Sequence, residues 1–346
     1  MSEYRSPLLD RPGAVPADPP DAGVAAHYGD PIREQRHLAA VAGMVDLSHR
    51  DVVRVSGPDR LSWLHNLTTQ RLDKLAPGVG AEALVLSPQG HVEHHLLLVD
   101  DGEATWVQVE PGAAAPLVEF LNSMRFMLRV EVADVTADWA IVWQPTREPH
   151  PEFLTRVDPQ GDAAAGRQVF VPRAQLTEFA DRAGDLIGVS ALEAVRVEAG
   201  RPRFGLETDH RTIPHELGWI GGAVVLDKGC YRGQETVAHV ANLGRPPRRL
   251  VRLHLDGSVR ETLPAPGAEI FVDGSAVGRV TTSAYHHELG PIALAVVKYM
   301  TPDDAAAVVG ADGAGVAASI EAVVERDTTA RPGQAARSAF RGRSLL

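Results

Sequence analysis

The sequence predicts an α+β protein that ends in a small all-β domain. From Asp51 to Val132, stretches of strand and helix composition follow one another in mixed order, which is typical of α+β folds. From Arg248 onward, alternating apolar and polar residues with short turn signals predict strands alone. The chain has 346 residues, more than a single hydrophobic core usually holds, so we expect two or three domains.

The composition limits which functions fit. Hydrophobic residues make up 44% of the chain, which allows a sizeable core, and the formal net charge is −11. Such an acidic chain does not favour nucleic-acid binding by bulk electrostatics. The single cysteine cannot form an internal disulfide, which fits a reducing compartment, although a secreted protein without disulfides would look the same. No apolar run reaches membrane-spanning length, so we expect a cytoplasmic protein without a membrane partner.

The amino-terminal residues 1–28 are rich in Pro, Ala and Asp. They lack the basic start and the apolar stretch of a signal peptide. We therefore expect a disordered lead-in, with the folded part beginning at residue 29.

The first α+β domain is expected to hold a strand, a helix, a three-stranded meander, a second helix and a returning strand. Ser56 as cap and Asp59 at the positive end of the dipole are expected to start the first helix. Turn signals at 88–90 and 100–102 separate the strands of the meander. The expected ranges of the strands and of the second helix are 51–56, 82–87, 91–99, 103–110, 113–124 (helix) and 126–132.

A second α+β domain is expected to include residues 136–188. Low apolar content, with Pro145, Pro149, Pro151, Pro159 and Gly161, predicts a long loop or an insertion inside a domain over residues 144–166. Ser190 and Glu193 have the spacing of a capping box, which predicts a helix that ends near Gly200.

The carboxyl-terminal domain is expected over residues 246–325, as a small barrel or sandwich. Asp273-Gly274, flanked by apolar runs, predicts a hairpin turn within it. The arginine-containing tail, residues 326–346, is expected to be a disordered solubilising end.

Cys230 is the most informative single residue. Glycines bracket it, Lys228 and Arg232 lie close in sequence, and a helix pattern begins near Gly233. Cations and a nearby helix start favour the thiolate, the form that attacks electrophiles or binds soft metals. The alternative is a buried cysteine that acts as a small hydrophobic residue. The polar, glycine-rich surroundings favour a functional thiol.

Glu198 is a second candidate, because a carboxylate at the end of a helix opposes the helix dipole. Such a carboxylate could accept two hydrogen bonds from a heterocycle, as a pterin presents them, or it could be a surface or arginine-paired glutamate. His91, Glu93 and His95 share one strand face and could bind a metal, but polar strand faces of this kind are common, and we expect no metal site.

Other chemical motifs are absent from the sequence. It contains no P-loop and no dinucleotide-binding glycine-rich turn. One cysteine cannot hold an iron–sulfur cluster by itself, because a cluster needs several thiolates.

Several stretches resemble the glycine-cleavage T-protein family. Residues 43–49, 54–59 and 67–69 resemble its opening, 198–205 its pterin-site segment, and 288–295 its carboxyl-terminal domain. Within that superfamily one octapeptide resembles the hallmark of the YgfZ branch. It reads Lys228-Gly229-Cys230-Tyr231-Arg232-Gly233-Gln234-Glu235.

The resemblance implies a three-domain ring around a channel for tetrahydrofolate or a folate derivative, with residues 29–245 as the folate-binding region. It also implies a monomer that assists iron–sulfur cluster assembly or repair, with iron–sulfur enzymes or assembly proteins as partners. Cys230 would be the functional thiol and Glu198 the pterin ligand. The remaining cofactor-site residues would be Lys228, Gly229, Tyr231, Arg232, Gly233, Gln234 and Glu235.

One departure from the T-protein pattern affects the expected chemistry. Where T-proteins carry an acidic pair that includes the catalytic aspartate, this chain has Glu93 and His94. A proton-transfer group must lie within hydrogen-bond reach of its target, so this change argues against aminomethyl transfer. An aminomethyltransferase-type enzyme and a non-enzymatic folate-responsive scaffold are the alternative functions.

Overall fold

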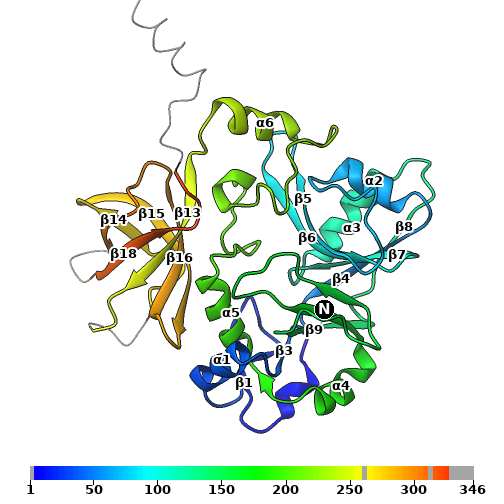
Figure 1. The fold of residues 1–346 in the computed structure, drawn as a ribbon, viewed down its shortest axis with the longest axis horizontal. Helices are drawn as coiled ribbons and strands as arrows, with labels where there is room; N and C mark the ends of the chain where they lie inside the picture. Colours follow the sequence, from blue (N-terminus) through cyan, green and yellow to red (C-terminus); the bar gives the residue numbers. More distant parts are fainter. Residues whose placement is uncertain (1–3, 259–262, 311–314, 327–346) are drawn as a thin grey trace, which may run out of the picture.

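The computed structural model describes residues 4–258, 263–310 and 315–326. Two five-stranded sheets and a closed six-stranded barrel form three bodies that surround a common centre (Figure 1). The predicted α+β class, the three-domain arrangement and the carboxyl-terminal barrel are confirmed. None of the described helices is long and apolar enough to cross a membrane.

The first sheet is antiparallel and has the strand order β5-β6-β7-β4-β8. Its strands are β4 (Asp51–Ser56), β5 (Gly80–Leu86), β6 (Val92–Asp100), β7 (Ala104–Val109) and β8 (Glu131–Asp134). Helices α2 (Arg60–Leu67) and α3 (Ala114–Ser123) pack against it through Leu64 and Leu117, which have no exposed surface. The meander forms because its inward residues are apolar on successive strands. The expected strands and helices of this domain are present, with one correction. Residues 126–130, expected in the returning strand, form a turn because Phe126 has a positive φ (48°), and β8 begins only at Glu131.

The second sheet has the order β10-β11-β9-β3-β12. Its strands are β3 (Met44–Asp46), β9 (Trp139–Gln144), β10 (Thr155–Val157), β11 (Arg167–Pro172) and β12 (Leu186–Ile187). Its helices are α1 (Pro31–Ala39), α4 (Leu176–Arg182) and α5 (Val189–Glu198), and a 3₁₀ turn spans Arg173–Gln175. Residues 144–166, expected to be a long loop or an insertion inside the domain, contain the short strand β10. Arg156 in that strand is buried and donates to the Ala81 carbonyl and to Gln168, which fixes the segment to the first sheet.

The expectation of a disordered lead-in is wrong for the described residues 4–28. They form a 3₁₀ turn (Pro7–Asp10) and the pair β1 (Val15–Pro16) and β2 (Ala25–His27). Leu8 and Val24 are fully buried, and the Asp21 carboxylate binds Arg203, 182 positions away. Composition suggested disorder because the contacts that order this segment are long-range and leave no local pattern.

The barrel follows the order β13-β16-β15-β14-β17-β18. Its strands are β13 (Arg248–Leu255), β14 (Glu269–Val272), β15 (Ser275–His286), β16 (Gly290–Lys298), β17 (Ala306–Val309) and β18 (Val316–Ala322). Asp273 and Gly274 form the predicted hairpin turn, both with positive φ (50° and 74°), as a type I′ turn requires. The tail from residue 327 lies outside the described residues.

Two predictions of helix capping are wrong, as the observed starts of α2 and α5 show. α2 begins at Arg60 without a side-chain cap, rather than at Ser56. α5 begins at Val189 after Gly188, so Ser190 lies inside the helix and forms no capping box. A Cβ at Gly188 would lie 2.1 Å from the Ala26 carbonyl oxygen, so packing against β2 sets the helix start. α6 (Gln234–Leu243) begins after Gly233, as predicted, and a further 3₁₀ turn spans Pro214–Leu217.

Candidate functional site

A cavity of about 300 Å³ lies at the centre, where the two sheets and α5 meet. Its wall is strongly charged. The arginines of the wall are Arg50, Arg156, Arg196, Arg201 and Arg203. The carboxylates are Glu82, Glu110, Asp158 and Glu193. A small cavity that combines apolar residues with several charged groups suits a ligand that carries polar groups of its own.

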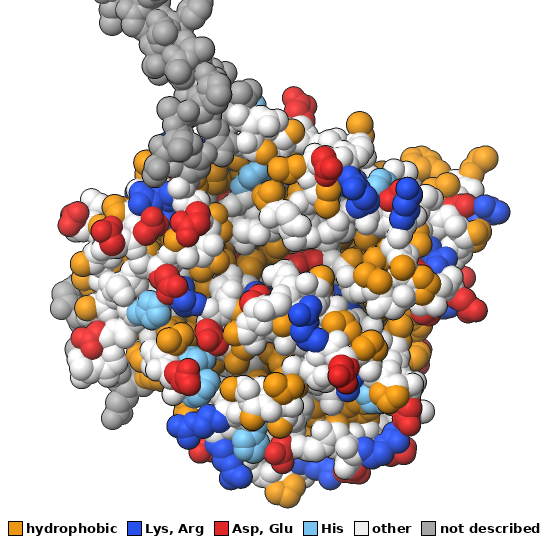
Figure 2. Space-filling model, in the orientation of Figure 1, with side chains coloured by type: hydrophobic (Ala, Val, Ile, Leu, Met, Phe, Trp, Pro, Cys, Tyr) orange, Lys and Arg blue, Asp and Glu red, His pale blue; other side chains and the backbone are white. Residues whose placement is uncertain are grey.

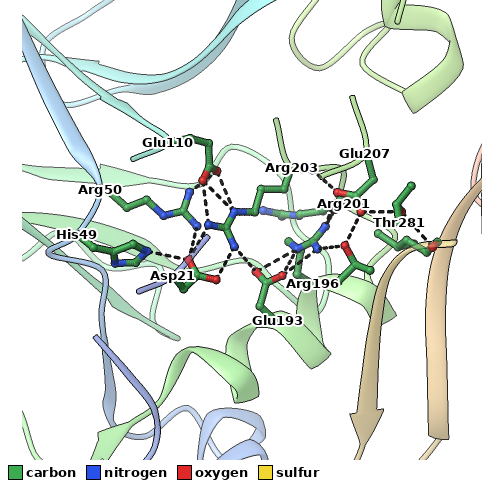
Figure 3. A network of polar contacts seen from close by, with 12 residues as sticks. Asp21, His49, Arg50, Glu110, Glu193, Arg196, Arg201, Arg203, Glu207 and Thr281 are labelled. Atoms are coloured by element: carbon green, nitrogen blue, oxygen red, sulfur yellow. Dashed lines mark hydrogen bonds and ion pairs between the residues drawn. The ribbon is translucent and has the colours of Figure 1, made fainter. Parts of the chain in front are cut away.

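Arg203 is the centre of the buried charge network, as Figure 3 shows. It donates to both oxygens of Asp21, at 2.8 and 2.6 Å, and to Glu110 at 2.9 Å, and it lies 3.4 Å from Glu193. Burial alone would lower the pKa of Arg203, but Glu193, Glu110 and Asp21 outweigh it and raise the pKa. One permanent cation therefore holds three carboxylates from three separate parts of the chain.

Arg196 extends the network to the barrel. It pairs with Glu193 at 2.9 Å and with the buried Glu207 at 3.0 Å. Glu207 accepts hydrogen bonds from Thr281 (2.8 Å) and Thr282 (2.6 Å) of β15. The network thus connects the amino-terminal segment, the first sheet, α5 and the barrel around one cavity (Figure 3).

The opposite wall combines a carboxylate with two flat rings. Glu82 accepts from His95 at 2.6 Å and from Gln160 at 2.9 Å. The His95 ring lies against the Trp219 ring, with 5.1 Å between their centroids. Burial alone would raise the pKa of Glu82, but the hydrogen bond and charge of His95, with Arg156 and Arg201, hold this pKa at about 2.

This lowered pKa predicts a loss of stability in acid. The contribution of Glu82 is complete above its ordinary pKa of 4.5 and is lost as the pH falls toward about 2. We expect the free energy of unfolding of the wild type, minus that of Glu82→Gln, to fall by about 3 kcal/mol across that window. Urea unfolding at a series of acidic pH values measures it. Exposed Glu178→Gln is the control, and an equal pH dependence of both variants would refute the assignment.

Three polar atoms of the cavity wall have no hydrogen-bond partner among the described residues. They are Oε1 of Gln108, Nε of Arg50 and Nη2 of Arg201. Gln108 is 2% exposed, so its amide oxygen is buried in the wall without an internal partner. A buried unpaired acceptor is costly, and a bound polar ligand can remove that cost. Nothing in the local sequence of β7 distinguishes Gln108, which sequence reasoning missed, together with Glu82 and Asp21.

Glu198, the predicted pterin ligand, does not line this cavity in the described structure. It is the last residue of α5, and its carboxylate lies 3.2 Å from Nε2 of His286 on the barrel. Leu192, Glu193 and Arg196 face the cavity at helical spacing, and Glu198 lies off that face. The carboxylate that α5 directs into the cavity is Glu193.

The predicted loop around Cys230 is a separate exposed site. Cys230 is free and exposed. Lys228 is buried, and its ammonium donates to the carbonyls of His65, Thr68 (2.7 Å) and Gln70 (3.0 Å) at the end of α2. Burial lowers the pKa of Lys228 to about 8. Lys228 is therefore an anchor for the loop, and its ammonium is committed to α2 rather than to the cavity.

The other residues of the octapeptide also serve the loop and its surroundings. Arg232 pairs with Glu93 at 2.7 Å and lies 5.3 Å from the centroid of Phe120. Gln234 donates to the Lys228 carbonyl at 3.3 Å. Tyr231 is buried, whereas Gly229 and Glu235 are exposed. Gly233 has φ 80°, and a Cβ there would lie 2.5 Å from the Ser87 carbonyl oxygen. In the described structure none of residues 228–235 lines the central cavity.

Comparison with known proteins agrees with this architecture. The GCVT N-terminal domain matches residues 24–143, and the glycine cleavage T-protein C-terminal barrel domain matches residues 248–331. The chain belongs to the T-protein superfamily. An aminomethyltransferase of Streptomyces coelicolor is 26% identical over 91% of this chain and 94% of its own length. The putative chloroplastic transferase At1g60990 of Arabidopsis thaliana is 28% identical over 69% of this chain, and the match spans 61% of that protein.

A solved structure has the same fold. Aminomethyltransferase T of the glycine cleavage system from Bartonella henselae superposes with a TM-score of 0.77 at 20% identity. The superposition covers 92% of this chain and 95% of that one. At this identity the likeness concerns the fold alone.

Within this T-protein-like fold, Glu93 and His94 line a neighbouring hollow of about 380 Å³, which shares Glu110 with the central cavity. The ion pair with Arg232 engages the Glu93 carboxylate. Burial and the charge of Arg232 lower the pKa of His94 to about 4, so this imidazole is neutral at pH 7. The described residues contain no cluster that could hold a metal, and His95 is bound to Glu82 instead. The Glu93 carboxylate in this hollow is therefore paired and is not free to transfer a proton.

Proposed function

We propose that this protein binds tetrahydrofolate or a related folate in its central cavity and assists the assembly or repair of iron–sulfur clusters through Cys230. The observation that carries the proposal is the exposed thiol of Cys230 on a loop fixed by Lys228. The resemblance of that loop to the YgfZ hallmark supports the iron–sulfur role. The family relationship supports the folate.

The cavity residues fit the pterin ring of a folate. The unpaired Oε1 of Gln108 can accept from a ring amine, and Nη2 of Arg201 can donate to a ring oxygen or nitrogen. The rings of His95 and Trp219 both line the cavity, where they would contact a bound heterocycle. The volume of about 300 Å³ lies at the lower end of small-molecule pockets, which suits a bicyclic ring. When bound, a folate would supply the one-carbon or redox chemistry of its pterin.

The exposed thiol of Cys230 could bind an iron–sulfur cluster jointly with another protein. A single thiolate cannot hold a cluster alone, so the other ligands would come from an iron–sulfur client or an assembly protein. Because Lys228 and Gln234 fix the loop, the thiol is presented from a defined backbone. The role of the chain would be to present one cluster ligand on a protein that also binds a folate.

Calorimetry with tetrahydrofolate tests the cavity. We expect wild-type protein to bind, and Gln108→Leu to bind about tenfold or more weakly, because it removes the unpaired amide oxygen. Glu198→Gln is the matched comparison, since its carboxylate faces His286. It should bind within about threefold of the wild type. No binding by the wild type would remove the folate proposal. If Glu198→Gln lost tetrahydrofolate binding and Gln108→Leu kept it, the ligand would bind at Glu198, as the sequence suggested.

The activity of a cluster-dependent enzyme in cells tests the role of the Cys230 thiol. We expect Cys230→Ala and Cys230→Ser to lower the activity of a cluster-dependent enzyme and growth under oxidative stress, while tetrahydrofolate binding is retained. The reason is that Cys230 lies outside the cavity wall and its sulfur is exposed. Equal protein amounts in cells serve as the control. Wild-type activity in both variants would exclude a role for the sulfur.

Aminomethyl transfer is a second candidate, favoured by the names of the relatives. The pairing of Glu93 with Arg232 and the neutral His94 argue against it. An assay of methylene-tetrahydrofolate formation from an aminomethylated lipoyl carrier protein decides between the two. We expect no turnover.

A further inference from the structure

An exposed apolar loop follows α3, at residues 125–129. Among the described large hydrophobic residues, Met127 (96% exposed) and Phe126 (83%) are the most exposed, and Leu128 (42%) follows them directly. Figure 2 shows hydrophobic side chains protruding at the edge of the molecule next to α2. Three consecutive bulky apolar residues without cover are unusual at the surface of a monomer and indicate an interaction site.

The loop is fixed in its exposed form. Its start is held by the Trp63 indole, which donates to the Met124 carbonyl at 3.1 Å. Its end is held by Arg129, whose backbone and side chain bond Asp59 at 2.7 to 3.1 Å. Phe126 has φ 48°, a left-handed conformation that is unfavourable for a non-glycine residue. A strained and anchored turn that displays apolar side chains is preorganised for binding.

The loop and Cys230 are attached to the same pair of helices. Lys228 binds carbonyls at the end of α2, and Arg232 lies over Phe120 of α3. Trp63 connects α2 to the end of α3 at the start of the loop. A partner that docks on residues 125–129 is therefore held in a defined relation to the exposed thiol.

We propose that residues 125–129 dock the protein that Cys230 serves, by inserting Phe126 and Met127 into an apolar pocket bordered by carboxylates. The inference rests on the proposed function, because it concerns the partner of that thiol. Arg125 and Arg129 are both exposed and flank the apolar residues. Arg129 is paired with Asp59, so Arg125 is the residue that favours an acidic rim. The net charge of −11 repels a second copy of this chain and an extended anionic membrane at long range, whereas an acidic rim on a partner is a local feature without that repulsion. Five residues also bury far less than the roughly 1,200 Å² of a stable dimer, which fits a transient partner.

The test uses the full chain in cells, with cluster-dependent enzyme activity as the readout. We expect Phe126→Ser/Met127→Ser and, independently, Arg125→Glu to lower that activity on the order of tenfold, as loss of a hot spot does. Thermal stability and tetrahydrofolate binding should be unchanged, because the substituted side chains contact solvent. The control is Val41→Ser/Met300→Ser, which removes exposed apolar surface at positions 62% and 59% exposed.

Several outcomes overturn the inference. Unchanged activity of the cluster-dependent enzyme in the loop variants overturns it, whatever the result for Cys230→Ala. Self-association of the wild type, measured by sedimentation and abolished in the loop variant, identifies a second copy as the occupant instead. Flotation with phosphatidylcholine–phosphatidylserine vesicles that depends on the loop identifies a membrane. Activity lost in the loop variants but retained in Cys230→Ala supports the docking surface and removes the proposed role of the thiol.

Discussion

Replacing Arg203 by Met is expected to lower the free energy of unfolding by about 3–5 kcal/mol, because it leaves buried carboxylates without their cation. Asp21, Glu110 and Glu193 would then share only Arg50, Arg196 and His49 as partners. Arg203 is 4% exposed, so water cannot replace the lost interactions without rearrangement. Urea unfolding near neutral pH measures the change.

The control for this prediction is Arg182→Met. Arg182 is 53% exposed and lies 3.6 Å from Glu152 and 3.8 Å from Glu178, so its loss should cost less than about 0.5 kcal/mol. Arg203→Met should also make the amino-terminal segment accessible to protease, because Asp21 loses its bidentate partner. Equal stability of the two variants would show that the network contributes little to the fold.

The barrel and the first sheet could be predicted because their signals are local. Alternation in β13 and the Asp273-Gly274 turn fix strand faces and a hairpin from neighbouring residues alone. The start of α6 after Gly233 is likewise readable, since the left-handed residue directly precedes the helix. Such signals depend on backbone geometry and survive without knowledge of tertiary contacts.

The cavity could not be predicted because its residues meet only through tertiary structure. Asp21 and Arg203 lie 182 positions apart, and Gln108 looks like any polar residue in a strand. The sequence drew attention to Glu198 through the helix dipole, but only the helical phase relative to the cavity separates it from Glu193. The family resemblance implied that Lys228 lies beside a ligand. Its anchoring role could not be foreseen, because its three carbonyl acceptors come from a segment 158 to 163 positions away.

Lys228→Met is the second large effect we expect, both on stability and on function. The substitution keeps the aliphatic stem but removes the ammonium that binds the carbonyls of His65, Thr68 and Gln70. Leaving these acceptors unpaired should cost about 2–4 kcal/mol, and the end of α2 and residues 226–233 should exchange amide hydrogens faster. The exposed Lys298, which donates to the Ala276 carbonyl at 2.8 Å, gives the control Lys298→Met, with a change below about 0.5 kcal/mol.

The same variant separates an anchoring role of Lys228 from a chemical one. If Lys228 anchors the loop, cellular activity should fall toward that of Cys230→Ala in parallel with faster exchange in α2, although the thiol is still present. Activity lost with unchanged hydrogen exchange would instead mean that the ammonium acts directly on the cargo or the folate. The buried position and three carbonyl partners favour anchoring, since an ammonium that donates all three of its protons to the backbone has none left for a ligand.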